Sequence, residues 1–112
     1  MKHNYAEYVP VLKALSDETR LRILDMVSCG EMCACRILEE FNITQPTLSY
    51  HMKILAESGL VDARRDGAWM RYTLNQDRAG EVRSFISDIF RTEEDCGCTD
   101  CGPGCGKGSR NG

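Results

Sequence analysis

The segment spanning residues 33–59 constrains the fold more than any other part of the sequence. A short apolar pattern from residue 33 or 34 to Phe41 predicts a helix that Asn42 closes in the left-handed conformation. After a tight turn, Thr44 is a suitable cap for a second helix that ends at Gly59. Two short helices joined by such a turn are typical of a helix-turn-helix unit. The residues expected to face inward are Ile37, Leu38 and Phe41, then Leu48, Met52 and Leu55.

Two further helices are predicted before this unit. The first follows an apolar stripe, with Pro10 either in its opening turn or breaking it. The second has Ser16 as its expected cap and continues as a buried stripe until Gly30. The stripe residues are Tyr5, Val9, Leu12 and Leu15 in the first helix, and Leu21, Leu24 and Val27 in the second.

A β-hairpin and a last helix are predicted after residue 59. Two extended runs, 60–65 and 68–74, are joined by Asp66-Gly67, a pair that suits a two-residue turn. The last helix begins near residues 75–77 and has more large apolar side chains than a small domain covers by itself. We therefore expect a homodimer interface built from the terminal helices. Its residues in the last helix are Val82, Phe85, Ile86, Ile89 and Phe90.

The expected fold is therefore mainly α with a small β-hairpin. It is a winged helix-turn-helix of about five helices plus the wing, dimeric through its terminal helices. Residues 1–92 are assigned to this DNA-binding and dimerisation domain. Residues 93–112, rich in cysteine and glycine without a hydrophobic period, are expected to form a flexible tail.

Composition and charge limit the class of protein. The chain has 112 residues and 42% hydrophobic content, which suffices for one modest core. No apolar run is long enough to span a membrane and no signal sequence is recognisable, so we expect a cytoplasmic protein. The net charge is −3, but residues 44–75 carry four basic and three acidic side chains. A surface that faces DNA is therefore expected in the middle of the chain.

The seven cysteines fall mainly into two tight clusters. One is Cys33-x-Cys35, at the start of the third predicted helix, and the other lies in the tail at Cys96, Cys98, Cys101 and Cys105. In a reducing cytosol such clusters are more often ligands or redox thiols than structural disulfides. Backbone N–H groups at a helix start lower the pKa of a thiol and so favour a thiolate that binds soft ions.

Five segments, in order within residues 10–90, resemble one known family. They are 15–24 (LSDETRLRIL), 31–35 (EMCAC), 44–52 (TQPTLSYHM), 59–61 (GLV) and 64–69 (RRDGAW). Together they are similar to the ArsR/SmtB repressors. The resemblance implies a dimeric winged-helix repressor whose affinity for DNA falls when a metal or metalloid binds. It also implies that Cys33 and Cys35 are the sensor, as in the branches that respond to arsenic and antimony or to cadmium and lead.

The residues expected to bind operator DNA lie on the second helix of the helix-turn-helix and on the wing. Short polar side chains near the start of a recognition helix reach base edges, and basic ones bind phosphate. The expected set is Gln45, Thr47, Ser49, Tyr50, His51, Lys53, Arg64 and Arg65. His51 is ambiguous, because packing or a phosphate hydrogen bond fits it as well as a base contact. No cofactor is expected to be required for DNA binding.

The identity of the inducer and its third ligand stay open. In the arsenic branch a third cysteine commonly follows three positions after the second, but Leu38 occupies that position. The third thiolate then comes from Cys29 or from the tail of either subunit, or two thiolates suffice for an organoarsenical. The tail is otherwise a second soft-ion site or a simple appendage. In an intact helix, residues 33 and 35 point about 200° apart, so one ion is expected to unwind the first turn.

The sequence also bears on four alternatives to an arsenite or antimonite sensor. A repressor of the same fold that responds to cadmium or lead fits the same cysteines. A redox-sensing repressor, in which Cys33 or Cys35 forms a disulfide with a tail cysteine, differs only in its trigger. An enzyme such as an arsenate reductase is disfavoured, because Cys29 and Arg36 are one residue too far apart for the phosphate loop. Zinc sensing is also disfavoured, since the last helix has no histidine.

Overall fold

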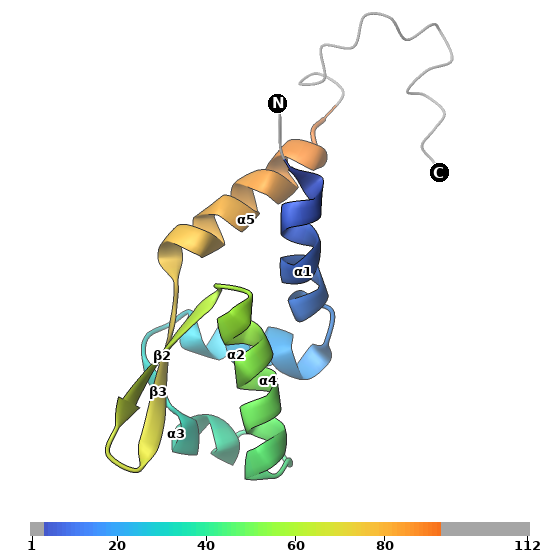
Figure 1. Cartoon of the computed structure of the whole chain (residues 1–112). Helices are drawn as coiled ribbons and strands as arrows, with labels where there is room; N and C mark the ends of the chain where they lie inside the picture. Colours follow the sequence, from blue (N-terminus) through green and yellow to red (C-terminus); the bar gives the residue numbers. More distant parts are fainter. Residues whose placement is uncertain (1–3, 93–112) are drawn as a thin grey trace, which may run out of the picture. The chain divides into compact units, whose positions relative to one another are not determined.

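The computed structural model describes residues 4–92 and contains, within that range, five helices and a three-stranded antiparallel sheet (Figure 1). The mainly helical winged helix-turn-helix predicted from the sequence is confirmed. The elements in order are α1 (Tyr5–Leu15), α2 (Glu18–Val27), β1 (Met32–Cys33), α3 (Ala34–Glu39), α4 (Gln45–Glu57), β2 (Val61–Asp66), β3 (Trp69–Leu74) and α5 (Gln76–Ile89). None of these helices is long and apolar enough to cross a membrane.

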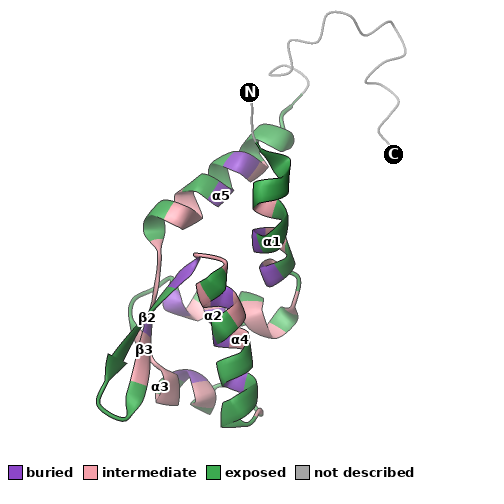
Figure 2. Ribbon diagram, in the orientation of Figure 1, coloured by how far each residue is buried: buried purple, intermediate pink, exposed green. Residues whose placement is uncertain are grey.

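Helix α1 buries a different face from the predicted one (Figure 2). Val11 and Ala14 are buried, whereas Tyr5 and Val9 are exposed. Apolar side chains lie on two sides of this helix, and the side that carries Val11 and Ala14 is the one that is covered. Pro10 lies inside the helix without ending it.

Helix α2 begins one residue later than predicted. Asp17, and not Ser16, is its cap, since the Asp17 carboxylate accepts a hydrogen bond of 3.0 Å from the backbone N–H of Arg20. Ser16 instead ends α1, with its hydroxyl donating to the carbonyl of Lys13. The buried residues of α2 are Ile23 and Val27, while Leu21 is exposed.

The helix-turn-helix is formed by α3 and α4. The hydroxyl of Thr44 accepts a hydrogen bond from the Thr47 N–H and caps α4, as predicted. Leu48, Met52 and Leu55 are its buried residues, also as predicted. In α3 Ile37 is buried, whereas Leu38 and Phe41 are only half-buried. The left-handed conformation predicted for Asn42 is wrong, because only glycines have positive φ among the described residues.

The sheet has one strand more than the predicted hairpin. Strand β1 pairs with β3, with Met32 opposite Tyr72 and Cys33 opposite Arg71, so the strand order is β1-β3-β2. Two residues are too few to show an alternating pattern, so this strand could not be predicted from the sequence. Asp66 pairs with Trp69 across the β2–β3 turn, so the two central residues are Gly67, with φ of 66°, and Ala68, one position later than predicted.

Helix α5 carries the apolar residues assigned to the dimer interface. The Asn75 side chain accepts a hydrogen bond from the Arg78 N–H at its start. Val82 and Phe85 are buried, whereas Ile89 and Phe90 are exposed by 43% and 75%. The chain divides into two compact units, of which the first ends at Val82.

Candidate DNA-binding surface and thiol pair

Helix α4 presents a row of exposed polar side chains on the side away from its buried face. Leu48, Met52 and Leu55 fix the orientation of the helix against the core, since each is buried. The residues left exposed include five of the predicted base-reading and phosphate-binding set, namely Gln45, Thr47, Ser49, Tyr50 and Lys53. This surface fits the requirements of a recognition helix, with short polar groups near the N-terminus and a cation further along.

His51 is held within the protein rather than on that exposed row. Only 12% of its side chain is exposed. Its Nδ1 lies 3.1 Å from Nη1 of Arg20 and 3.9 Å from the carboxylate of Asp17. Arg20 in turn donates from Nε to the carbonyl of Ala14. His51 therefore connects the recognition helix α4 to the start of α2, which is a positioning contact.

The wing contains three arginines in different environments. Arg64 lies 2.9 Å from the carboxylate of Glu31, and Arg71 lies 2.6 Å from that of Asp66. Arg65 donates to the carbonyl of Gly67 at 3.4 Å, and the structure shows no carboxylate partner for it among the described residues. Arg65 is therefore the wing cation that is most available to phosphate.

The sulfur atoms of Cys33 and Cys35 lie 2.7 Å apart. This corrects the expectation that the two side chains point to opposite sides of a helix. Cys33 is not in the helix but caps it in an extended conformation, with φ −73° and ψ 144°, and its Sγ accepts from the Cys35 N–H at 3.3 Å. A single ion can therefore reach both sulfurs without any unwinding of α3.

The two thiols have opposite electrostatic environments. The hydrogen bond from the Cys35 side chain, followed by the backbone N–H groups of Cys35 and Arg36 and by the charge of Arg71, lowers the pKa of Cys33. The same hydrogen bond, together with burial and the charge of Cys33, raises the pKa of Cys35. The predicted lowering is therefore right for Cys33 and wrong for Cys35, because the hydrogen bond that the two sulfurs share shifts their pKa values in opposite directions.

A third ligand is not found next to the pair in the part of the chain that the structure describes, where no three histidine, cysteine or carboxylate groups gather. Cys29 is exposed. The tail cysteines Cys96, Cys98, Cys101 and Cys105 lie outside the described residues.

Cys33 belongs to the wing sheet as well as to the thiol pair, and the sequence alone did not reveal this. Cys33, Arg71 and Arg64 occupy directly opposed positions on the three strands, so their side chains share one face of the sheet. Glu31, two residues before Cys33, reaches Arg64 on that face. In the sequence, the signal for this connection between the thiol pair and the wing was Glu31, an acidic residue two positions before Cys33.

Known proteins resemble this chain in both amino-acid sequence and fold. The pattern described as bacterial regulatory protein, arsR family, matches residues 17–63. The chain is 43% identical over 95 residues to the arsenical resistance operon repressor of Staphylococcus xylosus, covering 85% of this chain and 91% of that protein. It is 44% identical over 95 residues to the repressor of the same name from Staphylococcus aureus, with the same coverage. Among solved structures, an ArsR-like transcriptional regulator from Rhodococcus sp. RHA1 matches with a TM-score of 0.66 at 27% identity, over 76% of this chain and 80% of that one.

The fold, the exposed recognition helix and these relatives define a winged helix-turn-helix transcriptional regulator and not an enzyme. Within that class, the chain belongs to the ArsR family of bacterial regulatory proteins.

Proposed function

We propose that this protein is a homodimeric repressor that leaves its operator when Cys33 and Cys35 bind trivalent arsenic or antimony. The observation that carries the proposal is the convergence of the two sulfurs, 2.7 Å apart, at the junction of the wing sheet and α3. Thiolates are the ligands that soft ions select. The names of the two staphylococcal relatives support arsenic as the inducer.

The DNA half of the proposal rests on α4 and the wing. Gln45, Thr47, Ser49 and Tyr50 contact base edges, while Lys53 and Arg65 bind phosphate. His51 acts by holding α4 against α2 through Arg20. Base contacts then provide sequence specificity, and the cations provide affinity that depends on salt.

The inducer signal passes from the thiols to the wing. When an ion binds, it replaces the proton between Cys33 and Cys35 and fixes the 33–35 segment. Cys33 is part of β1 and Cys35 is part of α3, and α3 contacts both β1 and β3. Because Cys33 lies opposite Arg71 and Glu31 holds Arg64, a displacement of β1 changes how the wing arginines are presented to DNA. A tail cysteine, Cys96, Cys98, Cys101 or Cys105, from either subunit completes the three-thiolate site that arsenite prefers.

The proposal is tested by inducer release from an operator duplex that the protein itself selects from a random pool. Arsenite, antimonite and phenylarsine oxide should each weaken binding by about 5- to 150-fold, the usual range of allosteric coupling. Cys33→Ser and Cys35→Ser should keep the affinity for DNA and lose the response. Cys29→Ser is the matched control and should respond like the wild type. Release by cadmium or lead alone would instead assign the chain to a different inducer.

A redox repressor is the second candidate, because two adjacent thiols also suit disulfide formation. Here a peroxide takes two electrons and two protons from the thiols, giving one disulfide and two waters. Peroxide without any metalloid would then release the operator, and a thiol reductant would restore binding. Release by arsenite under reducing conditions, with no effect of peroxide, excludes this candidate.

A further inference from the structure

Three sulfur-containing residues outside the thiol pair line a shallow pocket that opens to solvent. Met26, Cys29 and Met32 are spaced three residues apart in the sequence. Together with Gly30 and Glu31 they line a pocket of about 200 Å³. Met26 comes from the last turn of α2, Cys29 from the following turn and Met32 from β1.

The backbone explains why these residues meet. Gly30 has φ of 151°, a conformation that L side chains rarely adopt, and no atom lies within 4 Å of where a Cβ would be. Gly30 connects the end of α2 to β1, and residues of both elements line the pocket. Met26 and Met32 are half-buried and Cys29 is exposed, so the pocket is open to an ion from solvent.

This pocket is separate from the thiol pair. Successive side chains of a strand point to opposite faces of the sheet. Met32 pairs with Tyr72, which is buried, whereas Cys33 pairs with Arg71. The Met32 sulfur and the Cys33 sulfur therefore lie on opposite faces of β1.

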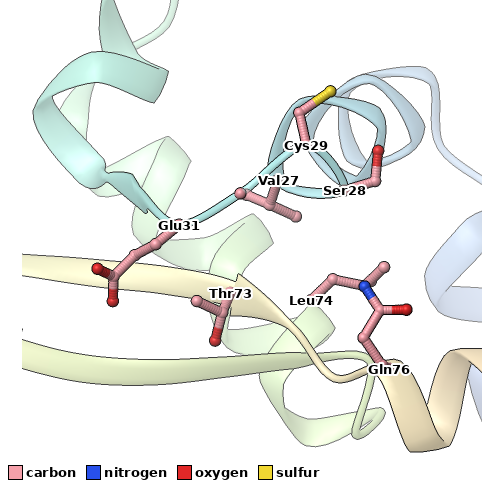
Figure 3. A pocket seen from close by; sticks show the side chains of 8 residues that line it. Val27, Ser28, Cys29, Glu31, Thr73, Leu74 and Gln76 are labelled. Atoms are coloured by element: carbon pink, nitrogen blue, oxygen red, sulfur yellow. The ribbon is translucent and has the colours of Figure 1, made fainter.

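A neighbouring pocket of about 330 Å³ shares Cys29, Gly30 and Glu31 with the smaller one. Its other lining residues contain no sulfur and are Val27, Ser28, Thr73, Leu74 and Gln76. Figure 3 shows the Cys29 sulfur pointing away from Glu31, Thr73 and Gln76, the polar side chains of this larger pocket. The Glu31 carboxylate is itself paired with Arg64. The smaller pocket is thus the one in which soft donors predominate.

We propose that Met26, Cys29 and Met32 form a second ion site that takes a soft monovalent cation of the Cu(I) or Ag(I) class. One thiol sulfur and two thioether sulfurs are a donor set that selects Cu(I) over zinc and over oxygen-binding ions. Thioethers carry no charge, so this set suits a monovalent ion better than arsenite, which needs thiolates. The site is independent of the proposed inducer and lies on the other face of β1.

The test uses Ag(I), which does not change oxidation state, and the full-length chain labelled with ¹³C at the methionine methyl groups. Cys33, Cys35 and the four tail cysteines are replaced by serine, so that Cys29 is the remaining thiol. One equivalent of Ag(I) should shift the methyl signals of Met26 and Met32 and leave those of Met52 and Met70 in place. Cys29→Ser in this background should weaken Ag(I) binding at least about tenfold, a change of about 1.4 kcal/mol.

Methionine variants separate the site from general thiol binding. Met26→Leu and Met32→Leu conserve volume, so the fold should persist, and each should weaken Ag(I) binding. Met70→Leu is the matched control and should bind Ag(I) as the parent does. Binding of Ag(I) without a shift of the Met26 and Met32 signals, or unchanged binding after Cys29→Ser, would overturn the proposal.

Discussion

At the scale of single residues, we propose that Glu31 limits how much positive charge the wing offers to DNA. Its carboxylate neutralises Arg64 at 2.9 Å, while Arg65 has no such partner among the described residues. Two adjacent arginines with equal formal charge are therefore expected to contribute unequally to binding. Arg65→Ala should weaken binding to every duplex and reduce the salt slope, whereas Arg64→Ala should do so to a lesser degree.

Glu31→Gln tests this inequality directly. The substitution frees Arg64 for a phosphate, so affinity for DNA should rise and the slope of log K against log salt should steepen by about 0.9 for each bound subunit. Glu39→Gln is the control, since Glu39 pairs with Arg36 at 3.9 Å and both side chains are exposed. Fluorescence anisotropy over a range of salt concentrations measures both quantities. An unchanged slope in Glu31→Gln would contradict the role of Glu31.

The carboxyl group of Asp17 should make the free energy of unfolding depend on pH. The hydrogen bond from the Arg20 N–H lowers the pKa of this carboxyl below 3.8. A lowered pKa in the folded state stabilises the protein above the unfolded pKa, and that stabilisation is lost as the pH falls through the folded value. Asp17→Asn keeps the cap but removes the charge. The wild type should be more stable near neutral pH, by less than about 1 kcal/mol.

Urea unfolding from neutral pH downward checks this prediction. The difference between wild type and Asp17→Asn should begin to shrink as the pH falls toward the ordinary value of 3.8, and it should disappear only once the pH is below the lowered pKa of the folded state. A difference that stays constant over the whole range would show that the carboxylate charge plays no part.

At the scale of elements, a helix or strand could be predicted from the sequence where its own residues carry a cap, an apolar pattern or a terminating glycine. Helix α4 has its cap at Thr44, its buried stripe and its closing Gly59, where φ is 87°, so it was predicted closely. Strand β1 has two residues and depends on pairing with β3, so no local pattern could reveal it. The convergence of Cys33 and Cys35 follows from that strand, because Cys33 takes an extended conformation and caps α3.

Two exposed side chains of α4 test its proposed role as the recognition helix. Tyr50 and Lys53 are exposed, so Tyr50→Ala with Lys53→Ala should change the free energy of unfolding by no more than about 0.5 kcal/mol. The same change should strongly reduce affinity for the selected operator. Glu57→Ala, on an exposed position at the end of α4, is the matched control. Unchanged operator affinity in the double variant would remove α4 from the DNA interface.

At the scale of the whole molecule, the proposed homodimer needs an apolar surface, and we propose that the exposed end of α5 supplies it. Phe85 is already buried within one chain, whereas Ile89 and Phe90 are exposed by 43% and 75%. Ile89→Glu with Phe90→Glu should give folded monomers that bind DNA weakly, as measured by analytical ultracentrifugation. Leu21→Glu, on an exposed leucine of α2, should stay dimeric. A dimeric Ile89→Glu/Phe90→Glu variant with normal operator binding would contradict this interface.

The most direct test of the central claim is an arsenite titration of the operator complex with three full-length proteins. These are the wild type, the Cys33→Ser/Cys35→Ser variant, and a variant with all four tail cysteines replaced by serine. All three should bind the operator equally well. The wild type should release it, the double variant should not, and the tail variant should need more arsenite but respond nearly normally to phenylarsine oxide. Release of the double variant at the arsenite concentration that releases the wild type would contradict the account and move sensing away from the thiol pair.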